Sequence, residues 1–195
     1  MAKTILGRTC GSTSTKLAIY EDHNESVLET ISHPMEELRQ FKEIDDQMPY
    51  RRKAIDGFLE RNGKTYSDLD CIINRGANCR PVPSGIYEIT QQILDDIATE
   101  RWGKHPARIG VRLAYEIGKE HKVPAIFADP PISDEFEPLA RYAGIKELKR
   151  ISSLHVLNHK AIAKRYARSI NREYESMDLI VVHMGGGISV GAHKK

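Results

Sequence analysis

Residues 4–20 read TILGRTCGSTSTKLAIY, and the rest of the chain is best interpreted outward from this stretch. Two apolar segments flank a turn made of Gly11, four hydroxyl residues and Lys16, which predicts two strands joined by a polar turn. Glycine allows close backbone approach, and the hydroxyls and the lysine supply donors and one cation, so the turn could hold a phosphate. An ordinary hairpin with a polar tip is the alternative interpretation of the same residues.

Residues 179–190, LIVVHMGGGISV, repeat the plan of strand, glycine turn and strand. This echo favours a phosphate-binding role for the opening turn, and it indicates a second unit that begins as the first one does. The sequence therefore predicts two domains. The first covers residues 1–130, and residues 131–195 form the incomplete beginning of the second.

Between the two turns, strand and helix patterns alternate. β-branched and apolar residues predict a third strand at 27–32 and buried strands at 70–74 and 123–128. Spacings of three and four predict helices after Pro34 and Pro49, near 93–97, over 106–117 and near 155–173. This order predicts an α/β fold with a mixed sheet flanked by helices, and it resembles the ribonuclease-H-like half of an actin-like ATPase.

Composition excludes several classes of protein. The 195 residues are 40% hydrophobic and 29% charged, which is typical of a soluble globular protein. A net charge of +2 argues against a nucleic-acid partner. The three cysteines form no metal or disulfide spacing, which favours a reducing compartment and hence the cytoplasm. No apolar run approaches the roughly 20 residues of a membrane helix, so we expect no membrane partner.

Two charged residues follow predicted buried strands, at the position where open α/β sheets bind ligands. Arg75 could hold a carboxylate or phosphate in bidentate geometry, although a solvated arginine is the commoner case. Asp129 precedes two prolines, and its carboxylate could organise Mg²⁺ and its waters. An Asx-type turn before proline is the alternative reading of Asp129.

Histidines supply the remaining candidates. His155 and His159 stand four apart on a predicted helix, a spacing that could bind zinc, but no third ligand is evident. One histidine facing a cleft as a hydrogen-bond donor is the stronger hypothesis. The neighbouring stripe of Lys160, Lys164 and Arg168 is best read as a solvated helix face. His105 could be a capping or surface group.

The order of these motifs resembles the butyrate kinase branch of the acetate and propionate kinase family, within the actin-like ATPase superfamily. The resemblance spans nearly the whole chain. The residues that carry it are Gly11-Ser12-Thr13-Ser14-Thr15-Lys16, Arg75-Gly76, Arg80-Pro81-Val82-Pro83 with Gly85, Ala114-Tyr115-Glu116-Ile117, Asp129-Pro130 with Asp134-Glu135, His155 with Leu157-Asn158 and Lys160-Ala161, and His183 with Gly185-Gly186-Gly187-Ile188-Ser189-Val190-Gly191-Ala192-His193.

The resemblance implies transfer of the γ-phosphoryl of ATP, with Mg²⁺, to a short or branched-chain carboxylate, giving an acyl phosphate and ADP. It implies that Arg75 binds the carboxylate and the phosphoryl group, that His155 donates a hydrogen bond to the developing charge, and that Asp129 helps place Mg²⁺. It assigns the nucleotide phosphates to Gly11, Ser12, Ser14 and Lys16 and to Gly185, Gly186 and Gly187, with His183 beside them, and it makes His105 a further cleft histidine. It also implies a homo-oligomer in full-length form.

The chain departs from the family pattern near the expected site. Thr9 and Cys10 replace an asparagine and a proline before the opening turn, and Arg108 and Leu154 replace an asparagine and a phenylalanine. Relative to the family, the segments expected after residue 195 are also missing. We therefore expect little or no kinase activity from the 195-residue chain alone, and a non-catalytic relic that acts as a binding protein is the alternative hypothesis.

Overall fold

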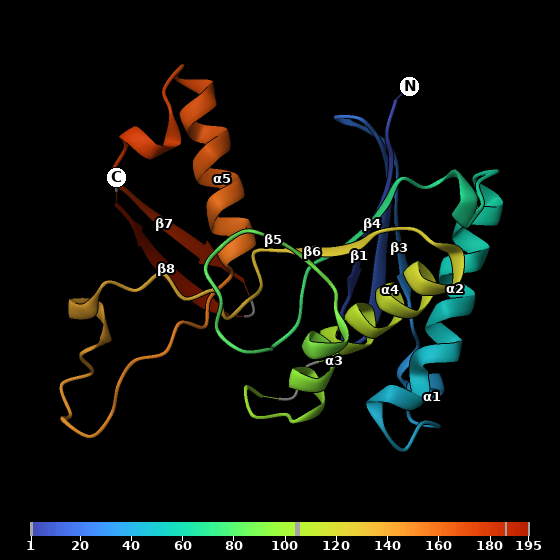
Figure 1. The fold of residues 1–195 in the computed structure, drawn as a ribbon, viewed down its shortest axis with the longest axis horizontal. Coiled ribbons are helices and arrows are strands. Elements are labelled where there is room, and N and C mark those ends of the chain that lie inside the picture. The colour runs from blue at the N-terminus through green and yellow to red at the C-terminus, as the bar shows by residue number, and fades with distance from the viewer. Residues whose placement is uncertain (1, 104–105, 186, 195) are drawn as a thin grey trace. The chain divides into compact units, whose positions relative to one another are not determined.

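The computed structural model describes residues 2–103, 106–185 and 187–194. The chain forms two compact units (Figure 1): unit 1 comprises Met1–Cys79 and Ile86–Ala128, and unit 2 comprises Arg80–Gly85 and Asp129–Lys195. The sequence-based division at residue 130 placed residues 80–85 in the first domain. They group with unit 2 because the Asp134 N–H donates to the Val82 carbonyl and the Asp129 N–H donates to the Gly85 carbonyl.

Unit 1 contains a mixed sheet of six strands in the order β3-β2-β1-β4-β6-β5. Strands β1, β2 and β3 form an antiparallel meander, β1 pairs with β4 and β4 with β6 in parallel, and β5 runs antiparallel to β6. The strands are β1 Thr4–Cys10, β2 Ser14–Glu21, β3 Asn24–Ser32, β4 Cys71–Asn74, β5 Ile86–Glu88 and β6 Ala125–Ala128. The predicted meander and the two predicted buried strands are therefore present.

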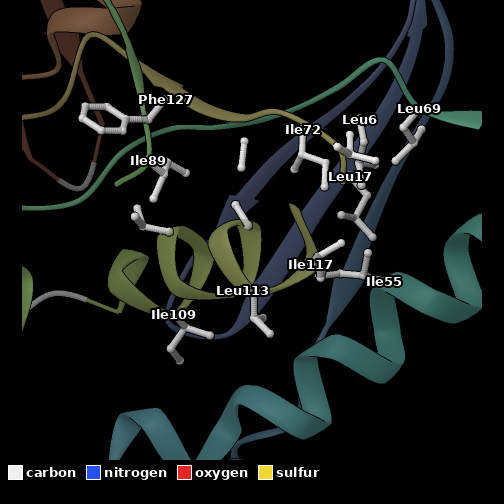
Figure 2. Packing of buried hydrophobic residues seen from close by; sticks show 14 of the residues in the cluster. Leu6, Leu17, Ile55, Leu69, Ile72, Ile89, Ile109, Leu113, Ile117 and Phe127 are labelled. Atoms are coloured by element: carbon white, nitrogen blue, oxygen red, sulfur yellow. The ribbon is translucent and has the colours of Figure 1, made fainter. Parts of the chain in front are cut away.

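Two helices build the core of unit 1 against this sheet. Helix α2 (Met48–Arg61) and helix α4 (Ala107–His121) bury their apolar faces, and Figure 2 shows side chains from both gathered with those of the strands. On α4 the spacing of Ile109, Leu113 and Ile117 gives one continuous stripe, and each full burial contributes roughly 1.5–3 kcal/mol. The smaller helical segments are α1 Met35–Leu38, η1 Ile44–Gln47, η2 Tyr66–Asp68 and α3 Gln91–Ala98.

Unit 2 contains a helix and a hairpin. Helix α5 (Val156–Ser169) packs against β7 (Leu179–Met184), which pairs antiparallel with β8 (Ile188–His193). Its 3-10 turns are η3 Pro138–Arg141 and η4 Tyr174–Ser176. Alternate hairpin residues are half-buried, whereas the other face is exposed and apolar. Its large exposed side chains are Ile180, Val182, Met184, Ile188 and Val190. None of the described helices is both long and apolar enough to span a bilayer.

Candidate active site

The opening turn is the tip of the β1–β2 hairpin. The Gly11 N–H donates to the Ser14 carbonyl at 2.8 Å, which closes the turn. Ser12, Thr13 and Lys16 are exposed, so their hydroxyls and ammonium face solvent, whereas Thr15 is buried. The hairpin interpretation and the phosphate interpretation are thus compatible, because the tip presents polar donors on a rigid two-stranded base.

A buried arginine from α2 holds this turn in place. Arg51 Nη2 donates to the Ser12 carbonyl at 2.9 Å, and Nη1 donates to the Ser14 carbonyl at 3.2 Å and to Thr15 Oγ1 at 3.3 Å. Nε and Nη2 also donate to Gln47 Oε1 at 3.1 and 3.0 Å. Burial lowers the pKa of Arg51, and the neighbouring Cys10 opposes that shift. The planar fork of the guanidinium is well suited to this divergent set of acceptors.

A second polar chain supports Thr15 from the other side. Tyr50 Oη donates to Glu37 Oε2 at 2.6 Å, so it accepts the proton of His33 Nδ1 across 3.2 Å. His33 Nε2 then accepts from Thr15 Oγ1 at 2.8 Å. Burial and Arg51 lower the pKa of His33, and Glu37 opposes that shift. The lowered pKa favours a neutral imidazole, and the hydrogen bonds place its proton on Nδ1.

Sequence reasoning missed Arg51, although a signal was present. Arg51, Ile55 and Phe58 stand at i, i+4 and i+7 on one helix, so the arginine occupies a position of the apolar face. A charged residue at such a position needs buried acceptors. The sequence does not say which acceptors these are, because the turn that supplies them lies about 40 residues earlier in the chain.

Arg75 lies at the same edge of the unit 1 sheet as the opening turn. Strands β1 and β4 run parallel with Arg8 opposite Asn74, so the carboxyl ends of both strands meet at this edge. The Arg75 N–H donates to the Arg8 carbonyl at 3.3 Å, and the Arg75 side chain is half-buried. The placement agrees with the general position of ligand sites in open α/β sheets.

Asp129 clamps the segment at residues 80–85. Its Oδ1 accepts the Gly85 N–H at 2.9 Å, and its own N–H donates to the Gly85 carbonyl at 2.9 Å. This long-range contact, not a local Asx-type turn, holds the carboxylate, and Asp129 has a positive φ of 41°. The described residues contain no group of three or more metal-ligating side chains. One carboxylate fits Mg²⁺, which keeps most of its water and is commonly held by one or two carboxylates with phosphates.

Four histidines gather in unit 2. His155 and His183 stack with ring centroids 3.8 Å apart and planes within 4°. The fully buried His159 lies 6.5 Å from His183 and 5.9 Å from His193, centroid to centroid. Asn158 Nδ2 contacts His183 Nδ1 at 2.9 Å.

Ser189 on β8 joins two of these histidines, and sequence reasoning missed its role. Its Oγ lies 3.0 Å from His155 Nδ1 and 3.0 Å from His159 Nε2. His155 is the N-cap residue of α5 and His159 lies one turn further along, so both rings face the hairpin, where the register of β7 with β8 sets the position of Ser189.

The remaining predicted residues have the following places. Gly185 donates its N–H to the Gly187 carbonyl at 3.1 Å, which closes the second turn. Gly186 and His105 lie outside the described residues.

Lys160 of the basic stripe pairs with Glu135 at 2.6 Å. Burial alone would raise the pKa of Glu135, but Lys160 and Ser84 outweigh it and the pKa is lowered.

Arg108, one of the departures from the family pattern, has a structural partner set in unit 1. Its Nε donates to Asp45 Oδ1 at 2.9 Å, and its Nη1 donates to Glu100. Arg112 shares Asp45 through Oδ2. These contacts tie α4 to η1.

No known family model matches the chain, but curated sequences do. A probable butyrate kinase from Enterococcus faecalis is 41% identical over 193 residues, which are 99% of this chain and 53% of that protein. Butyrate kinase 1 from Clostridium acetobutylicum is 41% identical over 184 residues, which are 94% of this chain and 52% of that protein. The chain thus spans about half the length of the curated relatives it matches. The predicted resemblance to butyrate kinases is confirmed.

Solved structures share the fold. The acetate kinase of Porphyromonas gingivalis aligns with a TM-score of 0.70 at 14% identity, covering 98% of this chain and 55% of that one. A propionate kinase from Francisella tularensis aligns with a TM-score of 0.66 at 18% identity, covering 97% of this chain and 54% of that one. The predicted actin-like ATPase fold is confirmed by these neighbours and by the mixed six-stranded sheet.

Proposed function

We propose that this chain, a homologue of the butyrate kinases, is part of a carboxylate kinase that transfers the γ-phosphoryl of ATP to a short or branched-chain carboxylate. The products are an acyl phosphate and ADP. The observation that carries the proposal is the 41% identity to butyrate kinases along nearly the whole chain. The rigid, donor-rich opening turn at the same sheet edge as Arg75 supports it. Homo-oligomerisation and a cytoplasmic location are part of the same proposal.

The two units supply different groups in this scheme. In unit 1 the Gly11–Lys16 turn binds phosphate oxygens, and Arg75 binds the carboxylate and the phosphoryl group with its guanidinium fork. In unit 2 His155 donates a hydrogen bond to the phosphoryl oxygens, and the turn at 185–187, with His183, binds nucleotide phosphates. In-line transfer of this kind depends on positioning and charge neutralisation, so rigid supports such as Arg51 contribute directly. Mg²⁺, when bound, neutralises phosphate charge, and the Asp129 carboxylate would hold it through water.

A chimera tests the activity. The 195-residue chain would be fused to the unmatched half of Clostridium acetobutylicum butyrate kinase 1, and acyl phosphate would be trapped as hydroxamate with ATP, Mg²⁺ and butyrate. We expect turnover from the chimera, little from the chain alone, and loss of at least 100-fold in Arg75→Ala. A soluble, folded chimera without turnover would instead favour the non-catalytic binding protein. Thr9→Asn with Cys10→Pro would then be added, and a gain would locate the defect in these two residues.

Asp129 can be tested separately from its structural clamp. Asp129→Asn keeps an oxygen for the Gly85 N–H and tolerates the positive φ, whereas Asp129→Ala loses the acceptor. We expect the asparagine variant to keep wild-type stability but to need more Mg²⁺ for half-maximal turnover. The Asp129→Ala variant should be less stable than the wild type and should also need more Mg²⁺. Equal Mg²⁺ dependence in Asp129→Asn and wild type would refute the proposed magnesium role.

A further inference from the structure

We propose that Ser189 is a positioning residue that fixes the tautomer of His155 through a hydrogen-bonded chain running from the buried His159. The chain of contacts is His159 Nε2 to Ser189 Oγ to His155 Nδ1, with both distances 3.0 Å. All three residues belong to unit 2, so these contacts lie within one compact unit.

The direction of proton donation along this series of hydrogen bonds follows from His159. Its side chain is fully buried, and Nδ1 has no hydrogen-bond partner among the described residues. A neutral imidazole carries its proton on one nitrogen. A buried N–H without an acceptor is rarer and costlier than a buried acceptor without a donor. His159 therefore carries its proton on Nε2 and donates it to Ser189 Oγ.

The neutral state of His159 is supported by its surroundings. Burial lowers its pKa, and the neighbouring His193 and His183 lower it further. A charged His159 would need an acceptor at Nδ1 as well, and no such acceptor lies beside that atom in the described residues. The His159 ring is therefore fixed as a one-proton donor to the serine.

Ser189, which accepts a hydrogen bond from His159, donates one to His155. Having accepted from His159, the hydroxyl has one proton to donate, and His155 Nδ1 is its other neighbour. Nδ1 of His155 is thus an acceptor, and neutral His155 carries its proton on Nε2. The stacked ring of His183 limits rotation of His155 out of this geometry.

Gly191 leaves space for the His159 ring beside β8. A Cβ at this position would lie 2.6 Å from His159 Nδ1 and 3.2 Å from its Cε1. Because His159 is enclosed on all sides, it could not move away cheaply. A glycine at 191 is therefore what allows His159 to approach β8 and reach Ser189.

The consequence for catalysis rests on the proposed function. A phosphoryl group in transfer carries charge on oxygens that only accept hydrogen bonds, so the useful form of His155 is a donor. The serine chain keeps Nε2 protonated even when the imidazole is neutral. His155 can then donate at a pH where most free histidines have lost their charge.

Nitrogen-15 NMR tests the tautomers on the 195-residue chain without any substrate. Long-range proton–nitrogen correlations in neutral buffer should show Nε2 protonated and Nδ1 unprotonated in both His155 and His159. In Ser189→Ala, His155 should become a mixture of both tautomers, whereas Ser189→Thr should keep the single form. Ser169→Ala, an exposed serine at the end of α5, is the matched control and should change neither ring.

Each outcome decides the matter. A proton on Nδ1 of either wild-type histidine, or an unchanged His155 tautomer in folded Ser189→Ala, would overturn the proposal. If Ser189→Ala does not fold, the wild-type tautomers and Ser189→Thr still decide it. In the active chimera we expect kcat about tenfold lower in Ser189→Ala with KM unchanged, and recovery in Ser189→Thr. An inactive chimera with the expected tautomers would refute the proposed kinase function and leave the serine chain intact.

Discussion

Arg8 on β1 lies directly opposite Asn74 on β4 in the parallel register, and both side chains are buried in the core of unit 1. Arg8 Nη2 donates to the Gly110 carbonyl. Among the described residues, Nε and Nη1 of Arg8 and both amide atoms of Asn74 have no hydrogen-bond partner. Burial lowers the pKa of Arg8. The pair therefore costs stability, because buried polar groups are stabilising only when they are satisfied.

Replacing this arginine should make the protein more stable. Arg8→Met keeps an unbranched apolar side chain of similar reach and removes the unsatisfied nitrogens. We expect the free energy of unfolding to rise by about 1–3 kcal/mol, measured by urea denaturation. The exposed Arg39→Met should change it by less than about 0.5 kcal/mol. A loss of stability in Arg8→Met would mean that the guanidinium has partners, such as buried water, in solution.

The opposite result is expected for Arg51. Arg51→Met leaves the carbonyls of Ser12 and Ser14 without their buried donor, and we expect a loss of about 2–4 kcal/mol in urea denaturation. Arg51→Lys should recover only part of it, because an ammonium cannot reach the same divergent acceptors.

Hydrogen exchange locates the Arg51 effect. In Arg51→Met the Gly11 and His33 amides, which donate to the Ser14 and Thr13 carbonyls, should exchange faster than in the wild type. The amides of α5 in unit 2 should be unaffected. Uniform acceleration in both units would show that Arg51 supports the whole fold and not the turn.

Stability should fall as the solution becomes mildly acidic. His33, His159 and His193 all have pKa values lowered from 6.5, chiefly by burial. Near pH 6.5 these histidines become protonated in the unfolded chain but stay neutral in the folded chain. The free energy of unfolding therefore falls with decreasing pH until the folded histidines also titrate. Urea denaturation at about pH 7.5 and about pH 5.5 measures this decline.

Single variants identify the histidines involved. His33→Gln should reduce the decline, because it removes one of the buried titrating groups. His23→Gln, an exposed residue of the β2–β3 turn, is the control and should leave the decline as in the wild type. An equal decline in wild type and His33→Gln would contradict a contribution from His33.

The exposed face of the β7–β8 hairpin should drive self-association. Ile180, Val182 and Val190 are 75%, 51% and 62% exposed and lie on one face. Contiguous apolar surface of this kind promotes association. The triple change to threonine keeps β propensity and should shift sedimentation toward the monomer. Val181→Thr, on the face that packs against α5, should lower stability without this shift.

The sequence predicted the strands of the opening meander, the two buried strands, the two turns and most helices, because strand alternation and helical spacing are local properties. It did not predict what Arg51 binds, because helical spacing places that residue on the apolar face without naming the acceptors. The role of Ser189 depends on the register of a hairpin against a helix, which is a tertiary property. The membership of residues 80–85 in unit 2 depends on Asp129 and Asp134, which lie far along the chain.

Residues 80–85 belong to unit 2 although residues of unit 1 flank them in the sequence, and this affects how the two units can be produced separately. The chain leaves unit 1 after Cys79, returns at Ile86 and leaves again after Ala128. A protease nick at Ala128 would therefore divide unit 2 itself, and residues 129–195 would stay attached non-covalently, through their hydrogen bonds to residues 82–85. A recombinant piece that starts at Asp129 would lack Ser84 and Gly85, whose contacts hold Glu135 and Asp129. Independent production of unit 2 will need a circular permutation or a linker that restores residues 80–85.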